Sequence, residues 1–243
     1  MGSSTQPSTS TPPTAQTGAT QSSQNQEPTS PSSAATATAS PAGPTPSPTT
    51  QPASGSILCQ ADAAHGWNGW SGSSDWKVLN GQLLNDGTND DESLQPTIGA
   101  PCSLGGVSNY AVEVTLQITS ANSSYNDGFG ITVRGDPTKN PWHGYIAAIT
   151  YEGLDNNPYQ ARLIANGYYT FSIDSQILAS VPFNPGNRSH TYRVEVKGNS
   201  LKLLIDGGQL LAVTDNRYLT TTQVGLSCFG FQLAITSFKV IGL

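Results

Sequence analysis

The stretch "HTYRVEVKGNSLKLLIDGGQLLAVTD", residues 190–215, decides the fold class of this chain. Apolar and polar residues alternate in it from Tyr192 to Lys197, and two more alternating runs follow. The runs are separated by Gly198-Asn199 and by Asp206-Gly207-Gly208, which are typical hairpin turn sequences. A period of two residues places successive side chains on opposite faces of a strand. The stretch therefore predicts three antiparallel strands joined by two hairpins.

The same alternation continues through residues 57–243. "NYAVEVTLQI", residues 109–118, places its Val, Leu and Ile side chains on one face and Glu113, Thr115 and Gln117 on the other. Asn80-Gly81 and Asn166-Gly167 predict two more hairpins, with type I′ turns. Further strands are expected in "DGFGITVR", "GYIAAITY", "QILASVP", "QVGLSCF" and "QLAITSFKVIG". About a dozen short strands without an amphipathic helix predict an all-β, antiparallel two-sheet β-sandwich of the jelly-roll type.

Residues 1–56 have a different composition. They contain no Ile, Leu, Val, Phe, Trp or Tyr, they hold ten of the 17 prolines, and their only charged side chain is Glu27. Such a segment has too little to bury to offset the entropy cost of ordering, about 1–2 kcal/mol per residue. We therefore expect a disordered Ser/Thr/Pro-rich tether over residues 1–56 and one domain over residues 57–243. The tether is interpreted as a stalk that joins the domain to an upstream domain or anchor, and a simple interdomain linker is the alternative.

Charge and hydropathy exclude two kinds of partner. The net charge is −6, and all ten basic residues lie in the predicted domain against 15 of the 16 acidic residues. Nucleic acids and anionic membranes need clustered Lys and Arg, so neither is expected as a partner. No apolar run approaches the roughly 20 residues of a membrane span, so no membrane insertion is expected.

Three cysteines bear on location and on stability. The low Lys content, the abundant Thr, Asn and Gly, and the tether indicate an extracellular or cell-surface protein, where disulfides persist. We favour a disulfide between Cys59 and Cys102, which would pin the first strand to the segment that enters a central strand. The remaining cysteine, Cys228, would then be an inert buried thiol. The other pairings stay open.

A family resemblance rests on five segments in a characteristic order. They are "GWNGWSGSSDWKVLNGQLLNDG", "NYAVEVTLQI", "DGFGITVR", "HTYRVEVKGNSLKLLIDG" and "QVGLSCFG…ITSFKVIGL". This order resembles the concanavalin A-like lectin/glucanase sandwiches, and most closely the 3-keto-disaccharide hydrolase domains. The resemblance implies the same sandwich fold over residues 57–243. It also implies a carboxylate after a Gly-Tyr pair, but here Ile146 follows Gly144-Tyr145, which argues against hydrolase activity.

Candidate ligand-binding residues gather in two neighbouring segments. Sugars are bound by aromatic rings against the pyranose and by polar side chains on its hydroxyls. "NPWHGYIAAITYEG" and "YNDGFGITVRGD" supply both kinds, and the alternative for any single ring is packing in the core. The predicted ligand face consists of Trp142, His143, Tyr145, Tyr151, Tyr125, Asn126, Asp127 and Arg134.

Two sets of acidic residues are candidates for catalysis or for metal binding. Glycoside hydrolysis needs a carboxylate pair about 5–10 Å apart; Glu113 and Glu195 lie mid-strand, and we interpret each as a solvated residue opposite a basic neighbour. "NDGTNDDES", residues 85–93, contains oxygen ligands of the kind that Ca²⁺ prefers but lacks the full calcium-loop pattern. We predict no catalytic residues, no metal site and no cofactor, with Ca²⁺ at this turn as the alternative.

The main hypothesis is a non-catalytic extracellular recognition domain that binds a glycan or another surface polymer. The first alternative is a 3-keto-glycoside hydrolase or another enzyme that acts on glycans. The second alternative is a structural or protein-binding module.

Overall fold

The computed structural model describes residues 52–87, 97–121, 127–136, 138, 143–153, 159–165 and 176–243. The chain divides into two units, Met1–Pro46 and Ser47–Leu243, and all described residues belong to the second. Of the predicted tether over residues 1–56, residues 1–51 lie outside the described residues, and Gly55 N donates to Gly242 O at 2.8 Å. In the described part there is no helix, so there is also no helix that could cross a membrane.

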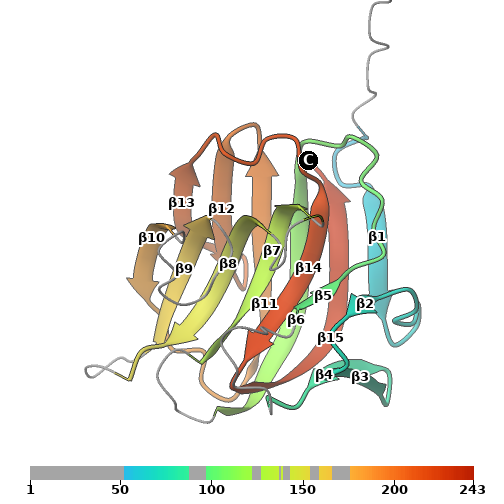
Figure 1. Cartoon of the computed structure of the whole chain (residues 1–243), viewed down its shortest axis with the longest axis vertical. Helices are drawn as coiled ribbons and strands as arrows, with labels where there is room; N and C mark the ends of the chain where they lie inside the picture. The colour runs from blue at the N-terminus through green and yellow to red at the C-terminus, as the bar shows by residue number, and fades with distance from the viewer. Residues whose placement is uncertain are drawn as a thin grey trace, which may run out of the picture. The chain divides into compact units, whose positions relative to one another are not determined.

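The described residues form two antiparallel sheets that pack face to face, as the sequence predicted (Figure 1). The eight-stranded sheet has the order β13-β12-β11-β6-β15-β4-β3, with β1 also paired to β15. Its strands are β1 (Ile57–Asp62), β3 (Trp76–Leu79), β4 (Gln82–Asn85), β6 (Tyr110–Ala121), β11 (Ser189–Lys197), β12 (Ser200–Ile205), β13 (Gly208–Thr214) and β15 (Phe231–Gly242).

The seven-stranded sheet has the order β10-β9-β8-β7-β14-β5-β2. Its strands are β2 (Ser71–Gly72), β5 (Thr97–Gly99), β7 (Gly128–Asp136), β8 (His143–Tyr151), β9 (Tyr159–Ala165), β10 (Gln176–Pro182) and β14 (Gln223–Phe229). The short strands β2 and β5 were not predicted, because two or three residues are too few to show a period.

The core lies between the sheets and is built from the alternating apolar residues. In β6 and β11 every second side chain is buried, and Val112, Val114 and Val194 are fully buried. Phe129 of β7 contacts Tyr192 of β11 across the interior, with ring centroids 5.1 Å apart in an edge-to-face arrangement. The residues that alternate with them along each strand therefore lie on the outer faces of the sandwich.

Hairpin geometry follows the turn residues. Asn80 and Gly81 have φ values of +52° and +74°, as a type I′ turn requires, and Leu79 pairs with Gln82. Asp206 and Gly207 have the same combination, at +51° and +81°, between Ile205 and Gly208. The Asn166-Gly167 hairpin lies outside the described residues.

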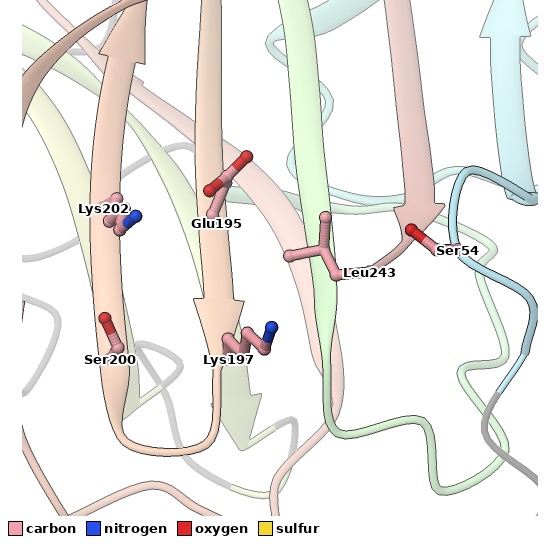
Figure 2. Close-up of a pocket in the computed structure, with 6 residues that line it drawn as sticks. All are labelled: Ser54, Glu195, Lys197, Ser200, Lys202 and Leu243. Atoms are coloured by element: carbon pink, nitrogen blue, oxygen red, sulfur yellow. The ribbon is translucent and has the colours of Figure 1, made fainter.

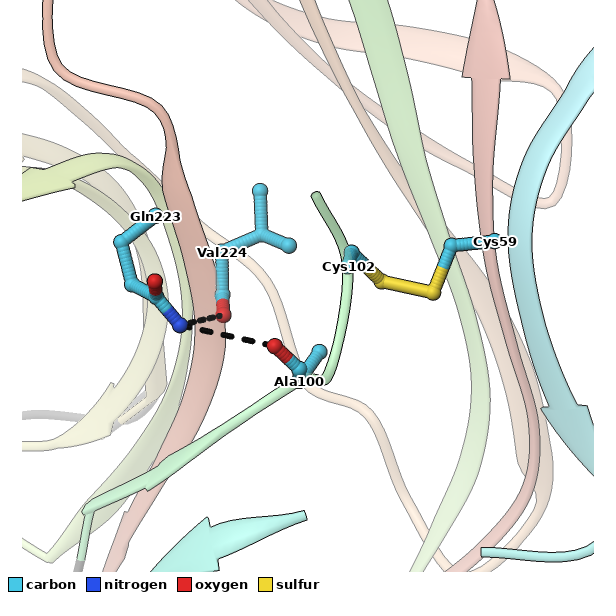
Figure 3. Close-up of a disulfide and its surroundings, with 5 residues drawn as sticks. All are labelled: Cys59, Ala100, Cys102, Gln223 and Val224. Carbon is cyan, nitrogen blue, oxygen red and sulfur yellow. Dashed lines mark hydrogen bonds between the residues drawn. A yellow bond between two sulfur atoms is a disulfide. The ribbon is translucent and has the colours of Figure 1, made fainter. Parts of the chain in front are cut away.

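A disulfide joins Cys59 to Cys102, the pairing favoured from the sequence (Figure 3). Cys59 is in β1 of the eight-stranded sheet, and Cys102 follows β5 of the seven-stranded sheet by three residues. The segment before Cys102 is held to β14, because Ala100 N donates to Val224 O at 3.1 Å. The covalent bond therefore connects the two sheets. Cys228 is a free buried cysteine, and burial raises the pKa of its thiol.

Candidate functional site

Arg134 stands out because both its backbone and its side chain are unusual. Its φ of +50° lies in the left-handed region that residues other than glycine rarely adopt. The register between β7 and β8 shifts between Val133 and Asp136, as in a β-bulge. Arg134 N donates to Tyr110 Oη at 2.9 Å, and Nη2 donates to Ser108 O at 3.1 Å. The bulge thus directs the guanidinium to the loop before β6, and Arg134 is only 2% exposed.

A cavity of about 250 Å³ lies over this arginine. Arg134 forms its buried part, whereas Ser108, Leu219 and Thr220 at its rim are exposed. The rest of the lining consists of Gly106, Val107, Thr221 and Thr222. Thr221 Oγ1 donates to Arg134 O at 2.6 Å and so fixes the loop against the bulge. The result is a small solvent-facing cavity that is lined by the buried Arg134 and by four residues that carry hydroxyl groups.

Among the described residues, the guanidinium of Arg134 has no carboxylate as an ion-pair partner. Its Nη1 atom is buried without a hydrogen-bond partner. The groups that act on it electrostatically are the phenols of Tyr110 and Tyr145. Burial raises the pKa of Tyr110 to about 12 and also raises the pKa of Tyr145, so both phenols stay neutral at physiological pH.

Tyr145 contacts and orders the loop between β13 and β14. Its hydroxyl donates to Asp215 Oδ1 at 2.7 Å and accepts from the backbone N of Arg217 at 3.1 Å. Its ring packs edge-to-face on Tyr218, with centroids 5.1 Å apart. The residue is 1% exposed, so its ring is part of the packing rather than an open stacking surface. His143 lies at the start of the same strand, paired with Asp136, and is partly exposed.

The carboxylate of Asp215, in the same loop, should make the free energy of unfolding depend on pH. Arg217 binds this carboxylate through Nε and Nη2, at 3.0 and 2.6 Å, and lowers the pKa of Asp215 well below its usual value. A depressed pKa in the folded state stabilises the protein above the unfolded-state pKa of about 3.9, and this stabilisation is lost progressively as the pH falls from that value toward the lower pKa of the folded state. We expect Asp215→Asn to lower the free energy of unfolding at pH 7 and to flatten its decline below about pH 5. Urea unfolding from pH 3 to 7 would measure both effects.

The control is Tyr145→Phe, which keeps the ion pair with Arg217, the largest cause of the lowered pKa. This variant should retain most of the wild-type pH slope. If the free energy of unfolding fell equally steeply with decreasing pH in Asp215→Asn and in wild type, Asp215 would not be the source of this pH dependence.

Asp127 and Tyr151 lie at the opposite end of β7 and β8. Tyr151 N donates to Asp127 O at 2.6 Å, and the Tyr151 ring packs on Tyr159 with centroids 5.1 Å apart. Asp127 is seven residues before Arg134, which corresponds to about 20 Å along a strand. The two strands are antiparallel, so they bring Arg134, His143 and Tyr145 to one end and Asp127 with Tyr151 to the other.

The predicted ligand face is therefore divided. Arg134, Tyr145 and Asp127 are 2%, 1% and 1% exposed, and only His143 and Tyr151 are partly exposed. Trp142, Tyr125 and Asn126 lie outside the described residues. The end with Arg134 has the cavity and is the candidate site.

The outer face of β8 has an apolar centre. Ile146 and Ala148 form a small buried cluster with Ile164 of β9. Ile146 is the residue that stands where the family resemblance implies a carboxylate. The apolar neighbours of Ile146 fit an apolar residue rather than a carboxylate, because they would disfavour an ionised group at this position.

Glu113 and Glu195 both contact the same arginine. Arg193 lies between them, with 3.3 Å from Nη1 to Glu113 and 2.9 Å from Nε to Glu195. Glu195 is also directly opposite Lys202 in the β11–β12 register. Both carboxylates are thus neutralised by basic neighbours on the outer face of the eight-stranded sheet.

A cavity of about 370 Å³ lies beside these charges. Figure 2 shows that Glu195 and Lys197 come from β11 and that Ser200 and Lys202 come from the neighbouring β12, with Ser54 and Leu243 as the other lining residues. The side chains of opposite sign stabilise the hairpin as cross-strand neighbours.

An apolar groove of about 680 Å³ runs along the β3–β4 hairpin. Val78 and Leu79 line it and are each 57% exposed. Its charged lining includes Lys77 and Asp86, which form an exposed ion pair of 3.0 Å. The groove is a second surface on which a ligand could be tested.

The acidic turn provides no metal site in the part of the chain that the structure describes. Of its acidic residues only Asp86 is described, and it is paired with Lys77. Within the described ranges no three His, Cys, Asp or Glu residues gather as metal ligands would. The remaining acidic residues, Asp90, Asp91 and Glu92, lie outside these ranges, so calcium at the turn stays a hypothesis.

The other cavity residues were not predicted from the sequence. Ser108 and Thr220–Thr222 are short hydroxyl side chains in loops and belong to no chemical motif. The available signal was "TTT" directly before a predicted strand, because ligand groups are often found where loops meet strand ends.

Solved structures with this fold include carbohydrate-binding and lectin domains. The carbohydrate-binding module CBM66 from Bacillus subtilis has a TM-score of 0.54 and 14% identity, covering 72% of this chain and 96% of that one. The lumenal domain of VIP36, with Ca²⁺ and Man3GlcNAc bound, has a TM-score of 0.57 and 16% identity, covering 75% and 87%. The Emp47p carbohydrate recognition domain has a TM-score of 0.55 and 12% identity, covering 80% and 99%. The fold is therefore a concanavalin A-like sandwich.

Residues 61–239 match the family of 3-keto-alpha-glucoside-1,2-lyase-like domains. The match covers most of the chain, and this protein belongs to that family. A comparison with curated proteins gave no match.

Proposed function

We propose that this protein is a non-catalytic carbohydrate-recognition domain and that the cavity at Arg134 is part of its ligand site. The observation that carries the proposal is a buried arginine among hydroxyl groups, in a small open cavity at one end of a lectin-like sandwich. Carbohydrate sites need a few convergent polar groups in a concave surface, and this cavity has them. Similar solved structures include a carbohydrate-binding module and carbohydrate recognition domains.

Family membership supports one other function, which is lyase or hydrolase activity on 3-keto-glycosides. Two features favour recognition over this activity. Ile146 lies in an apolar cluster where the resemblance implies a carboxylate, and Glu113 and Glu195 are both bound by Arg193. We expect no turnover of a panel of 3-keto-glycosides, with or without divalent metal ions. Turnover by the purified chain would overturn the non-catalytic proposal.

An extracellular location is part of the proposal. The disulfide supports it, because such bonds persist in oxidising compartments. The Ser/Thr/Pro-rich segment before the domain would act as a tether that holds the binding face away from a surface.

The binding test uses the full chain on an array of neutral and acidic glycans. Wild type should bind at least one class, and Thr220→Trp should abolish binding because an indole at the exposed rim would fill the cavity. The control is Val78→Lys, which changes the apolar groove at another exposed position, in β3.

The two variants separate the possible sites. Binding that is lost only in Thr220→Trp supports the cavity at Arg134. Binding that is lost only in Val78→Lys would move the site to the groove, and no binding to any glycan would overturn the proposed function.

A further inference from the structure

The guanidinium of Arg134 has an unused hydrogen-bonding capacity. A guanidinium presents its N–H donors in a planar fork that matches the two oxygens of a carboxylate. Nη2 donates to Ser108 O, whereas Nη1 is buried with no partner. A buried donor without a partner costs free energy, so a ligand that supplies the acceptor is favoured at this position.

The charge of this arginine is also uncompensated. Burial lowers the pKa of Arg134, but an arginine stays protonated at physiological pH. Its electrostatic neighbours are two neutral phenols, and no described carboxylate pairs with it. Buried charges are normally paired, so an anion beside this guanidinium would be favoured.

The dimensions of the cavity limit the anion. Its volume of about 250 Å³ is below the 300–1,000 Å³ typical of pockets for drug-sized ligands. It can therefore hold an anionic group and part of one ring, while the rest of a larger ligand would extend over the exposed rim at Leu219 and Thr220. Ser108, Thr220 and Thr222 line the same cavity and carry hydroxyl groups, which can donate to or accept from ligand oxygens.

We propose that the Arg134 cavity binds a carboxylate and that, given the proposed carbohydrate function on which this step rests, the carboxylate belongs to an acidic sugar unit such as a uronate. The left-handed backbone of Arg134 fits this role. Strained residues gather at binding sites, where the strain holds a side chain in the orientation that the ligand needs.

The test compares three probes on the full chain by isothermal titration calorimetry. They are a glucuronate-containing oligosaccharide, a neutral oligosaccharide of the same length in which glucose replaces glucuronate, and free glucuronate. Wild type should bind the acidic oligosaccharide at least about tenfold more tightly than the neutral one, because a hydrogen-bonded charge pair is the difference between them. Raising the salt concentration should weaken this preference.

Two substitutions at Arg134 test the mechanism. Arg134→Met removes the charge at similar length, and it should reduce binding of the acidic oligosaccharide to the level of the neutral one. Arg134→Lys keeps the charge but loses the planar fork, and it should give an intermediate affinity. Circular dichroism and thermal unfolding would establish that each variant is folded. If Arg134→Met does not fold, Thr220→Trp replaces it, because this rim residue is exposed.

Each outcome has one meaning. Preference for the acidic oligosaccharide that is lost in Arg134→Met supports the inference. Equal binding of both oligosaccharides by wild type and variant overturns the inference and leaves carbohydrate recognition in place. Binding of free glucuronate as tight as that of the oligosaccharide, lost in Arg134→Met, supports the inference and shows that a single acidic sugar unit occupies the cavity. No binding of either acidic probe overturns the inference.

Discussion

Replacing Gly230 by alanine should destabilise the domain by about 2–5 kcal/mol. Gly230 joins β14 of one sheet to β15 of the other, and its φ is +67°. An added Cβ would overlap the Asp127 carboxylate, which lies against this glycine. The left-handed backbone alone costs an alanine about 1–2 kcal/mol, and overpacking in a tight site adds about 1–3 kcal/mol. Urea unfolding monitored by tryptophan fluorescence would measure the change.

Gly186→Ala is the matched control. Its φ is +57°, but an added Cβ there would meet nothing within 4 Å. It should therefore show the backbone cost alone, about 1–2 kcal/mol. Combining Gly230→Ala with Asp127→Ala should cost less than the sum of the two single changes, because the shorter side chain removes the overlap. Equal effects of Gly230→Ala and Gly186→Ala would show that the carboxylate does not limit this turn.

Removing the Cys59–Cys102 bond should cost about 4 kcal/mol in the chain-entropy description of disulfides. The two cysteines are 43 residues apart, and the bond restricts a loop of that length in the unfolded chain. We expect the double variant Cys59→Ala/Cys102→Ala to unfold at a correspondingly lower urea concentration. Because the bond joins the two sheets, its loss should also increase hydrogen exchange in β1 more than in β11.

Chemical reduction provides the control for this prediction. A reductant should lower the stability of wild type toward that of the double variant and should leave the double variant unchanged. Cys228 should resist alkylation in the folded protein, because it is buried and its thiol pKa is raised. A double variant as stable as oxidised wild type would contradict the assigned role of the bond.

The fold could be predicted because its determinants are local. Alternation along β6 and β11 defines a buried and an exposed face, and Asn80-Gly81 specifies a turn that few other residue pairs adopt. The Cys59–Cys102 pairing was favoured for a similar reason, since each cysteine is next to a recognisable strand. The tether over residues 1–56 is a prediction from composition, and nothing in the described residues tests it.

The candidate site was harder to predict because it depends on distant contacts. Strict alternation would place Arg134 on the outer face with Thr132, and the bulge that turns it toward Ser108 leaves no local signal. Neighbours in sequence were expected to form one ligand face, but the length of β7 places Asp127 and Arg134 near its opposite ends. Loop hydroxyls such as Thr222 acquire a role only when the fold brings them to the guanidinium.

The position of β15 has a consequence for how the protein acquires its structure. This strand is the last of the described strands in chain order, yet it pairs with β6 along one side and with β1 and β4 along the other. While the ribosome is still making residues 231–242, three partner strands have no neighbour to complete their hydrogen bonding. The eight-stranded sheet can therefore close only after residues 231–242 have been made, and until then its open strand edges are exposed to pairing with other chains.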